Sequence, residues 1–451
     1  MPGPTHVVWQ IDVSERESPS TAAEEPRNGF VEAFSLLRRN RDFRNLFVAS
    51  LISLGGDWFL FVAIAGLIQD ATGQILGVSL LLFWQEIPYF LMSPLGGALA
   101  DRLDRRKLMV GCDLARAGLC LAFLFIGMST YWIAFPLLAV LSSFSAAFEP
   151  AFAAAVPNLV EPRDLGPANA LSGSSWGTML AVGAALGGVV TATLGRDAAF
   201  LVDAASFVIS AGLIFSIRGR LAEERDHREH PKIVQATKET AVYARKDHRV
   251  LALLTVKGGF GLGAGVLVLV TVFPKEVFHW NDYELGIGIL MAARGVGALI
   301  GPFLGRWLVG REDRRLFAII GAALATFGIA YAVFGLTPNL LLAAVAVGVA
   351  HLGGGAQWTL SSYGLQRIVP DHIRGRIFAF DGALITLTLG LSAVLTGLAA
   401  DRFGPRNTAV ALGAIALVWA VVWAWLTADV RRATMLEGCG PTPEIEPEPA
   451  G

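Results

Sequence analysis

Long apolar runs dominate the chain and recur at nearly regular intervals. A helix needs about 20 apolar residues to cross roughly 30 Å of hydrocarbon, and two sets of six runs meet that length. The first set is expected at 45–69, 76–100, 107–128, 131–155, 168–194 and 198–216. The second set is expected at 249–272, 284–306, 316–336, 338–362, 374–400 and 407–428. The pattern predicts an all-α integral membrane protein of twelve transmembrane helices in two six-helix bundles.

Lysine and arginine are distributed unevenly between the two sides of these spans. Of the 36 Lys and Arg, 29 fall in the tails and connections on the side that holds both termini. The connections on the opposite side hold only Arg196, Lys275, Arg402 and Arg406. Because positive residues are retained in the cytoplasm, we expect both termini to be cytoplasmic in a cell (inner or cytoplasmic) membrane.

Polar segments divide the chain further. We expect a cytoplasmic N-terminal tail over 1–44, a first bundle over 45–216, a cytoplasmic linker over 217–248, a second bundle over 249–428 and a C-terminal tail over 429–451. Residues 237–251 alternate apolar and basic positions at helical spacing, which indicates an amphipathic helix on the membrane surface or a solvated linker helix. The Pro- and Glu-rich C-terminal tail is expected to be disordered.

The composition excludes several functional classes. At 54% hydrophobic and 16% charged residues, the chain is too apolar for a water-soluble surface. Its net charge of −1 gives no electrostatic reason to expect nucleic acid as a partner. The sequence has no GxxxxGK[ST] loop for nucleotide phosphates. We expect neither enzymatic activity nor a cofactor or metal, and nothing requires more than a monomer.

Short matches between the two halves suggest an internal repeat. Residues 160–170, after the fourth span, align with 369–379, after the tenth. Gly97, after the second span, aligns loosely with Gly301, after the eighth. Such repeats are typical of transporters that bind substrate between two bundles near the middle of the membrane.

Residues 97–107, after the second span, read GALADRLDRRK. This segment resembles the loop of the major facilitator superfamily, which carries Gly, Asp, Arg and a closing basic cluster. Asp104 replaces a usual Gly, as is common in the branch containing the enterobactin exporter and macrolide efflux proteins. Further matches to that branch are GGDW at 55–58, DLAR at 113–116, PNLV at 157–160, ANA at 168–170 and RGR at 374–376. The resemblance extends from residue 34 to 428 and implies a major facilitator fold and secondary active transport.

The resemblance and the electrostatics of helix ends indicate a cytoplasmic gate. Asp101 ends the second span, and the eleventh span begins on the same side with a positive helix terminus. That terminus, Arg374 or Arg376 is expected to receive Asp101 when the cytoplasmic side is closed, with Arg116 as a second candidate. The alternative is that the basic loop is only a topology signal. The expected gate residues are Gly97, Asp101, Arg102, Arg105, Arg106, Asp113, Arg116, Arg374, Arg376 and Asp381.

Ionisable residues inside the spans are candidates for coupling, because a charge at mid-membrane costs about 2.5–3.5 kcal/mol on insertion scales. A proton-coupling carboxylate must be shielded yet reachable from each side in turn. Asp57 and Glu86 lie deepest, with Arg294 at similar depth. The residues expected at a coupling site or substrate cavity are Asp57, Glu86, Arg294, Glu149, Trp58, Trp84 and Trp358. The alternative is a set of buried pairs that only fix packing.

Other polar residues of the spans are expected to have structural roles. Lys257 is expected to extend toward the cytoplasmic surface and Asp203 toward the outer surface. Asp113 and Arg116, one turn apart, are expected to pair. His351 is expected to make a hydrogen-bonded contact between helices rather than bind a metal.

The sequence therefore predicts a proton-coupled efflux antiporter for an amphipathic small molecule such as a drug, a siderophore or another secondary metabolite. The proton, or another cation, and the lipid bilayer are the other expected partners. Antiporters of the family often carry GPxxGG in the fifth span, whereas residues 183–188 read GAALGG here. Uptake, lipid flipping, and a non-transporting receptor or scaffold are the alternatives.

Overall fold

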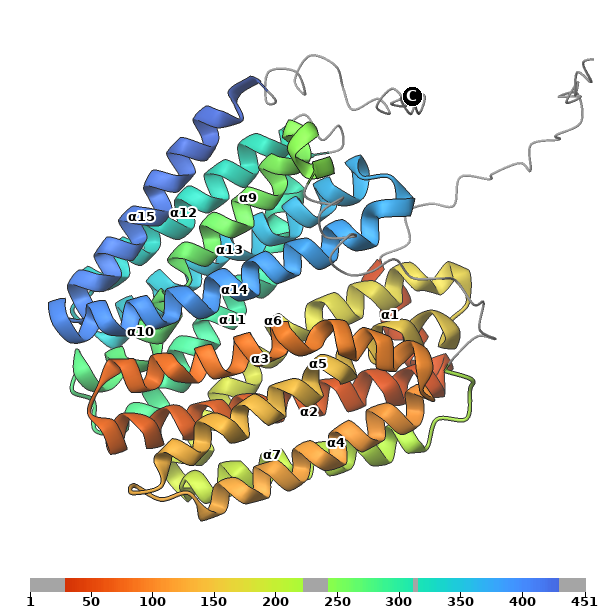
Figure 1. Ribbon diagram of the computed structural model, residues 1–451, viewed down its shortest axis with the longest axis horizontal. Helices are drawn as coiled ribbons and strands as arrows, with labels where there is room; N and C mark the ends of the chain where they lie inside the picture. The colour runs from red at the N-terminus through yellow and green to blue at the C-terminus, as the bar shows by residue number, and fades with distance from the viewer. Residues whose placement is uncertain (1–28, 222–241, 311–314, 430–451) are drawn as a thin grey trace, which may run out of the picture.

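The computed structural model describes residues 29–221, 242–310 and 315–429 as an almost entirely helical protein. A first bundle, the N-bundle, contains α2–α7, and a second, the C-bundle, contains α9–α15 (Figure 1). The N-bundle follows α1 (Gly29–Arg39) and comprises α2 (Arg41–Thr72), α3 (Ile75–Arg102), α4 (Arg105–Ala122), α5 (Ala134–Leu159), α6 (Leu165–Leu194) and α7 (Arg196–Phe215). The C-bundle comprises α9 (His248–Gly263), α10 (Val266–Glu276), α11 (Tyr283–Val309), α12 (Leu316–Leu336), α13 (Leu340–Ile368), α14 (Asp371–Phe403) and α15 (Pro405–Leu426).

Twelve segments of the described chain are long and apolar enough to cross a membrane, which confirms the predicted fold class. We call the end of the bundles at which α2 begins and α15 finishes the tail end, and the opposite end the far end. The tails before residue 29 and after 429 lie outside the described residues, as does part of the expected amphipathic segment at 237–251. Within that segment, residues 242–246 are helical, and His248 already begins the seventh span.

The seventh span is broken, which the hydropathy pattern did not predict. It consists of α9 and α10, separated at Ala264 and Gly265. Ser392 of α14 holds the break open by accepting a hydrogen bond from the Gly265 amide at 3.0 Å and donating one to the Leu262 carbonyl at 2.6 Å. A Cβ at Gly265 would lie 2.5 Å from the Ser392 carbonyl oxygen, so only glycine allows this approach.

The bundles join along two helix pairs, α6 with α11 and α3 with α14. The α6–α11 contact is nearly free of side chains, since a Cβ at Gly188 would lie 3.0 Å from the Cα of Gly288. On its other side α6 packs on α2, where a Cβ at Gly183 would lie 2.8 Å from the carbonyl oxygen of Gly55. The glycines at 183–188 therefore serve close packing of three helices, as small residues do in membrane proteins.

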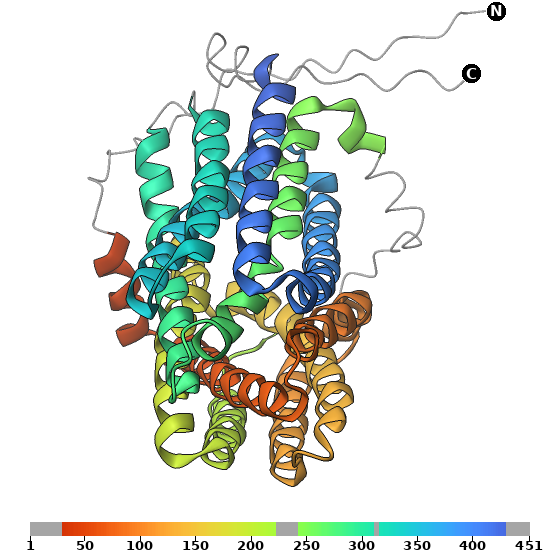
Figure 2. The same cartoon turned by 90° about the vertical axis from the view of Figure 1, so that its left-hand side faces the viewer.

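The bundles touch at the far end (Figures 1 and 2) and separate toward the tail end (Figure 1). Along α6, a Cβ at Gly177 would still lie 3.2 Å from the backbone of Leu299. Nearer the tail end, Gly173 and Gly166 lie on about the same face of α6, and a Cβ at either would meet nothing within 4 Å. The structure is therefore closed between the bundles at the far end and open at the tail end.

Candidate functional site

Acidic residues of the N-bundle lie at the level where the bundles separate. Glu86 of α3 faces α14, where a Cβ at Gly390 would lie 3.7 Å from the Glu86 Cβ. One turn on, the Tyr89 hydroxyl donates a hydrogen bond to Glu149 of α5 at 2.8 Å. Glu149 is nevertheless exposed, so it lies on an open face of the bundle rather than inside it.

Arg294 of α11 reaches into this region from the C-bundle. Its guanidinium carbon lies 5.9 Å from the centre of the Trp58 ring and 5.2 Å from that of Trp176, both in the N-bundle. Its Nε atom is buried without a hydrogen-bond partner, and so is the indole Nε1 of Trp58. Among the described residues, no carboxylate lies within ion-pair distance of Arg294, although Glu86 is close enough to act on it electrostatically. The arginine is thus held by aromatic faces and retains unused donor capacity.

Asp57 of α2 lies beside a second, fully buried carboxylate. One of its oxygens, Oδ1, is buried without a hydrogen-bond partner. The neighbouring Gly56 packs on α7, where its Cβ would lie 2.8 Å from that of Ser206. Asp203, one turn before Ser206, is 0% exposed and accepts a hydrogen bond from the Cys120 thiol at 3.0 Å. The expectation that Asp203 extends to the outer surface is wrong, because α2 and α7 approach too closely for the side chain to leave the bundle.

The three expected cavity tryptophans do not share one surface. Trp58 contacts Arg294 at the seam between the bundles. Trp84 is exposed and precedes Glu86 by two residues, which places it about 200° around α3 from that carboxylate. Trp358 lies in the C-bundle against Phe260, with ring centres 6.3 Å apart. Trp176, which the sequence analysis did not select, shares the seam with Trp58.

Each bundle encloses one buried ion pair. In the N-bundle Arg116 pairs with Asp113, as expected, and Ser210 donates to Asp113 at 2.6 Å. In the C-bundle Lys257 pairs with Asp381, with Lys257 only 2% and Asp381 only 3% exposed. The expectation that Lys257 extends toward the membrane surface is therefore wrong, because a carboxylate from α14 satisfies its charge inside the bundle.

Three of the expected gate residues belong to these ion pairs. The Arg116 guanidinium is enclosed by Phe148 and Phe207, at 4.6 and 4.3 Å from their ring centres. Asp113, Arg116 and Asp381 therefore lie within single bundles in this conformation, not between them.

His351 makes the expected contact between helices, with its Nε2 2.7 Å from the Tyr331 hydroxyl.

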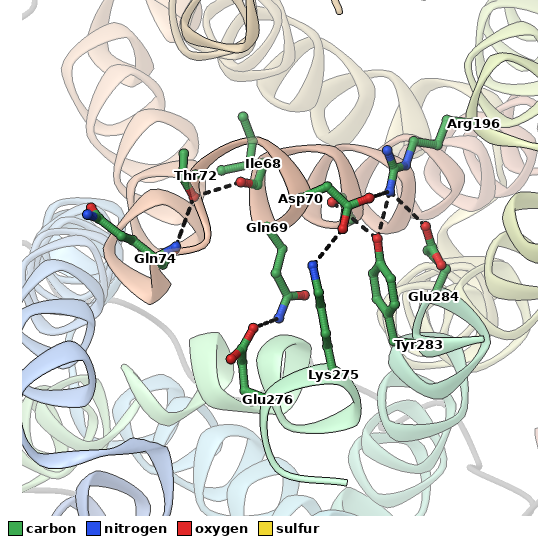
Figure 3. A network of polar contacts seen from close by, with 11 residues as sticks. Ile68, Gln69, Asp70, Thr72, Gln74, Arg196, Lys275, Glu276, Tyr283 and Glu284 are labelled. Atoms are coloured by element: carbon green, nitrogen blue, oxygen red, sulfur yellow. Dashed lines mark hydrogen bonds and ion pairs between the residues drawn. The ribbon is translucent and has the colours of Figure 1, made fainter. Parts of the chain in front are cut away.

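A polar network joins the bundles at the far end (Figure 3). Asp70, in the last turn of α2, pairs with Arg196 of α7 and with Lys275 of α10, the latter at 2.6 Å. Arg196 also contacts Glu284 at 2.9 Å and the Tyr283 hydroxyl at 2.7 Å, both on α11. In the sequence, Arg196 and Lys275 are recognisable only as topology markers. The acidic residues at the far ends of the first and eighth spans are the signal that points to this network.

Comparison with known proteins agrees with this architecture. The family model described as Major Facilitator Superfamily matches residues 46–351. The chain belongs to the major facilitator superfamily. It is 25% identical to macrolide efflux protein A of Streptococcus pyogenes, over 84% of this chain and 94% of that protein. It is 26% identical to the multidrug efflux pump Tap of Mycolicibacterium fortuitum, over 84% and 94%. It is 27% identical to the enterobactin exporter EntS of Citrobacter koseri, over 90% and 96%.

Solved structures show the same fold. A bacterial homologue of the lysosomal transporter Spinster, in an inward-facing and unoccupied conformation, superposes with a TM-score of 0.71 at 14% identity, covering 91% of this chain and 99% of that one. The nucleoside transporter NupG gives 0.68 at 11% identity, covering 85% and 98%. The protein is thus a multi-pass membrane transporter of the major facilitator superfamily, and its relatives include efflux proteins.

The superfamily loop at 97–107 folds against its own bundle in this structure. Asp104 caps α4 by accepting a hydrogen bond from the Lys107 amide at 3.0 Å. Arg105 donates to the carbonyls of Ala154 and Leu221 at 2.8 and 2.9 Å, and Arg106 donates to that of Gly219 at 2.9 Å. These arginines join α4 to α5 and to the segment after α7, so they stiffen the tail end of the N-bundle.

The remaining expected gate residues lie at the open tail end. Gly97 borders open space, since a Cβ there would meet nothing within 4 Å. Arg374 donates to the Val369 carbonyl at 3.1 Å, while Arg102 and Arg376 are placed at the neighbouring helix ends. The side chain of Asp101 lies outside the described residues. The gate stays a prediction for a conformation with the tail end closed.

Proposed function

We propose that this transporter is a proton-coupled exporter of an amphipathic small molecule, acting as a monomer in the cell membrane. The positive-inside pattern supports a cytoplasmic tail end, and with that orientation the conformation is inward-open. The names of its relatives, which export macrolides, several drugs or enterobactin, support export as the direction.

One observation carries the proposal. Two carboxylates of the N-bundle, Glu86 and the Tyr89-bonded Glu149, and Arg294 of the C-bundle lie near the level where the bundles separate, without forming an ion pair among the described residues. Groups at this level face the tail end in one conformation and the far end in the other. A proton on Glu86 cancels its attraction for Arg294, which gives the coupling ion a direct effect on the contact between the bundles.

Arg294 and its two tryptophans also suggest how substrate is held. Indole rings offer an apolar surface to an amphipathic molecule, and the unused donors on Arg294 and Trp58 offer hydrogen bonds to its oxygen atoms. Binding there replaces the cation–aromatic contacts that now bridge the bundles.

Transport in inverted membrane vesicles tests the proposal. Purified protein in such vesicles, with an imposed inside-acid gradient, should accumulate at least one of a panel of amphipathic fluorescent dyes and a catecholate siderophore. Glu86→Gln is expected to abolish gradient-driven accumulation, and Asp57→Asn tests the second carboxylate. Glu161→Gln, at an exposed position outside the seam, is the matched control and should transport normally.

Two results would count against the proposal. Accumulation that persists unchanged in Glu86→Gln and Asp57→Asn would remove proton coupling through these residues. An absence of flux for every compound, with correctly folded protein, would favour an uptake substrate, lipid flipping or a non-transporting receptor role.

A further inference from the structure

The first turn of α3 is capped by a side chain from the other bundle. Gln74, which precedes the helix, makes no side-chain cap. Instead, the carboxylate of Asp401, in the last turn of α14, accepts hydrogen bonds from the amides of Ile75 at 2.8 Å and Leu76 at 3.0 Å, one on each oxygen. The first amides of a helix have no partner within it and favour a negative charge. Asp401 therefore supplies from α14 the cap that α3 lacks.

A glycine in α14 allows the two helices to come close enough for this cap. Gly397 lies one turn before Asp401, and a Cβ there would be 2.8 Å from the Cα of Leu76. Any larger side chain at 397 would push α3 away from the carboxylate. The glycine and the aspartate thus form one unit, in which one residue permits the approach of the helices and the other stabilises it.

The sequence of this unit occurs a second time, at the opposite end of the same helix pair. Residues 397–402, which end α14 at the far end, read GLAADR, and residues 97–102, which end α3 at the tail end, read GALADR. The two helices pack against each other and run in opposite directions (Figure 1). Gly397 is in contact with α3, whereas Gly97 borders open space, in keeping with a closed far end and an open tail end.

By analogy with Asp401 and the first turn of α3, Asp101 would cap the first turn of α14. Its preceding residue, Pro370, makes no side-chain cap. The parallel repeat of the two bundles, combined with the inverted repeat within each bundle, relates such paired sites by an axis in the membrane plane. Because α3 and α14 are continuous helices, a tilt that brings their tail ends together moves their far ends apart.

We propose that Asp401 caps the first turn of α3 and thereby stabilises the closed far end, and that it does so in alternation with Asp101. Asp401 holds the first turn of α3 while the far end is closed. It releases that turn when Asp101 takes the equivalent place at the first turn of α14. The proposal concerns the conformational equilibrium alone and depends on neither the substrate nor the coupling ion.

The rate at which a buried far-end thiol reacts with maleimide measures how often this end opens. Ser79 is 0% exposed and lies against Gly397, so Ser79→Cys reacts only when α3 leaves α14. Modification of that peptide is followed by mass spectrometry in the purified full chain, without substrate or gradient. Asp401→Ala is expected to raise the rate roughly two- to thirtyfold, the range that loss of a helix N-cap covers.

Three further variants make the test decisive. Gly397→Leu should raise the rate without touching the carboxylate, and Arg402→Ala, which removes an adjacent charge, should leave it unchanged. Adding Asp101→Ala to Asp401→Ala should return the rate toward wild type, because the competing cap is lost. Unchanged rates in both Asp401→Ala and Gly397→Leu, with intact folding, would overturn the stabilising role of the cap. A further rise on adding Asp101→Ala would overturn the alternation.

Discussion

The polar residues of the spans fall into two groups with different neighbours. Asp113 pairs with Arg116 inside the N-bundle, and Lys257 pairs with Asp381 inside the C-bundle. Glu86, Glu149 and Arg294 lie where the bundles separate, and no ion pair links them among the described residues. Buried pairs fix packing within a rigid unit, whereas groups at the seam change their surroundings when the units move.

The Lys257–Asp381 pair gives a prediction about stability. Asp381→Asn leaves the Lys257 charge buried without its carboxylate, beside the Ser362 hydroxyl at 2.9 Å and the Trp358 ring. The expected loss is about 3–5 kcal/mol, because an uncompensated buried charge remains. Thermal unfolding of the purified protein should show a clearly lower midpoint for this variant. The double variant Lys257→Met/Asp381→Leu should recover most of it, and a double variant as unstable as the single one would contradict the assignment.

Sequence reasoning at this scale found the charged residues but not their partners. Hydropathy marks Lys257 and Asp203 as unusual, yet the Lys257–Asp381 contact joins residues 124 positions apart. Only the packing of α9 against α14 brings them together. Depth in a span therefore predicts that a charge needs a partner, and it leaves the identity of that partner to the tertiary structure.

Helices were the most predictable level of organisation, because the length of an apolar run is itself the physical requirement for crossing a membrane. The break between α9 and α10 was not predictable in this way. Glycine is common in membrane helices, and the break at Gly265 depends on Ser392 from another helix. The close α6–α11 crossing similarly depends on two glycines that meet only in the folded protein.

That crossing supplies a prediction about helix packing. A leucine at Gly188 would collide with the backbone of Gly288, so Gly188→Leu should weaken far-end closure. The maleimide reactivity of Ser79→Cys should rise roughly five- to 160-fold, since overpacking costs about 1–3 kcal/mol. Gly212→Leu on α7, where an added Cβ meets nothing within 4 Å, should leave it unchanged. Equal rates for the two variants would show that the crossing does not hold the far end closed.

For the whole molecule, the sequence indicated two bundles and a cavity between them, but not which end is closed. The closed end is the one at which interactions between the bundles have the more favourable total free energy. At the far end, these interactions include Asp70 with Lys275, Arg196 with Glu284, and Asp401 with the amides of α3. Their free energies are individually small, so local changes should shift the equilibrium between the two conformations without unfolding the protein.

Asp70→Asn tests this equilibrium. The substitution removes the charge shared by Arg196 and Lys275, which are partly exposed, so the expected effect is about 1 kcal/mol, or roughly fivefold in the reactivity of Ser79→Cys. Added salt should reduce the difference between the variant and wild type, because it screens the same interactions. Asp197→Asn, at an exposed position of the same end, should have no such effect. A salt-independent difference would point to altered packing instead of a missing charge.

The crossing of α6 and α11 at Gly188 and Gly288 can also serve as a pivot about which α6 rotates. From Gly188 back to Leu165, α6 provides an arm of roughly 35 Å at about 1.5 Å per residue. A rotation of about 15° at the crossing would sweep the tip of that arm through roughly 9 Å, a span comparable to a small amphipathic molecule. The width of a substrate admitted at the tail end then depends on how far the two helices can rotate at this crossing. A larger side chain at the crossing should narrow the range of substrate sizes that the protein carries.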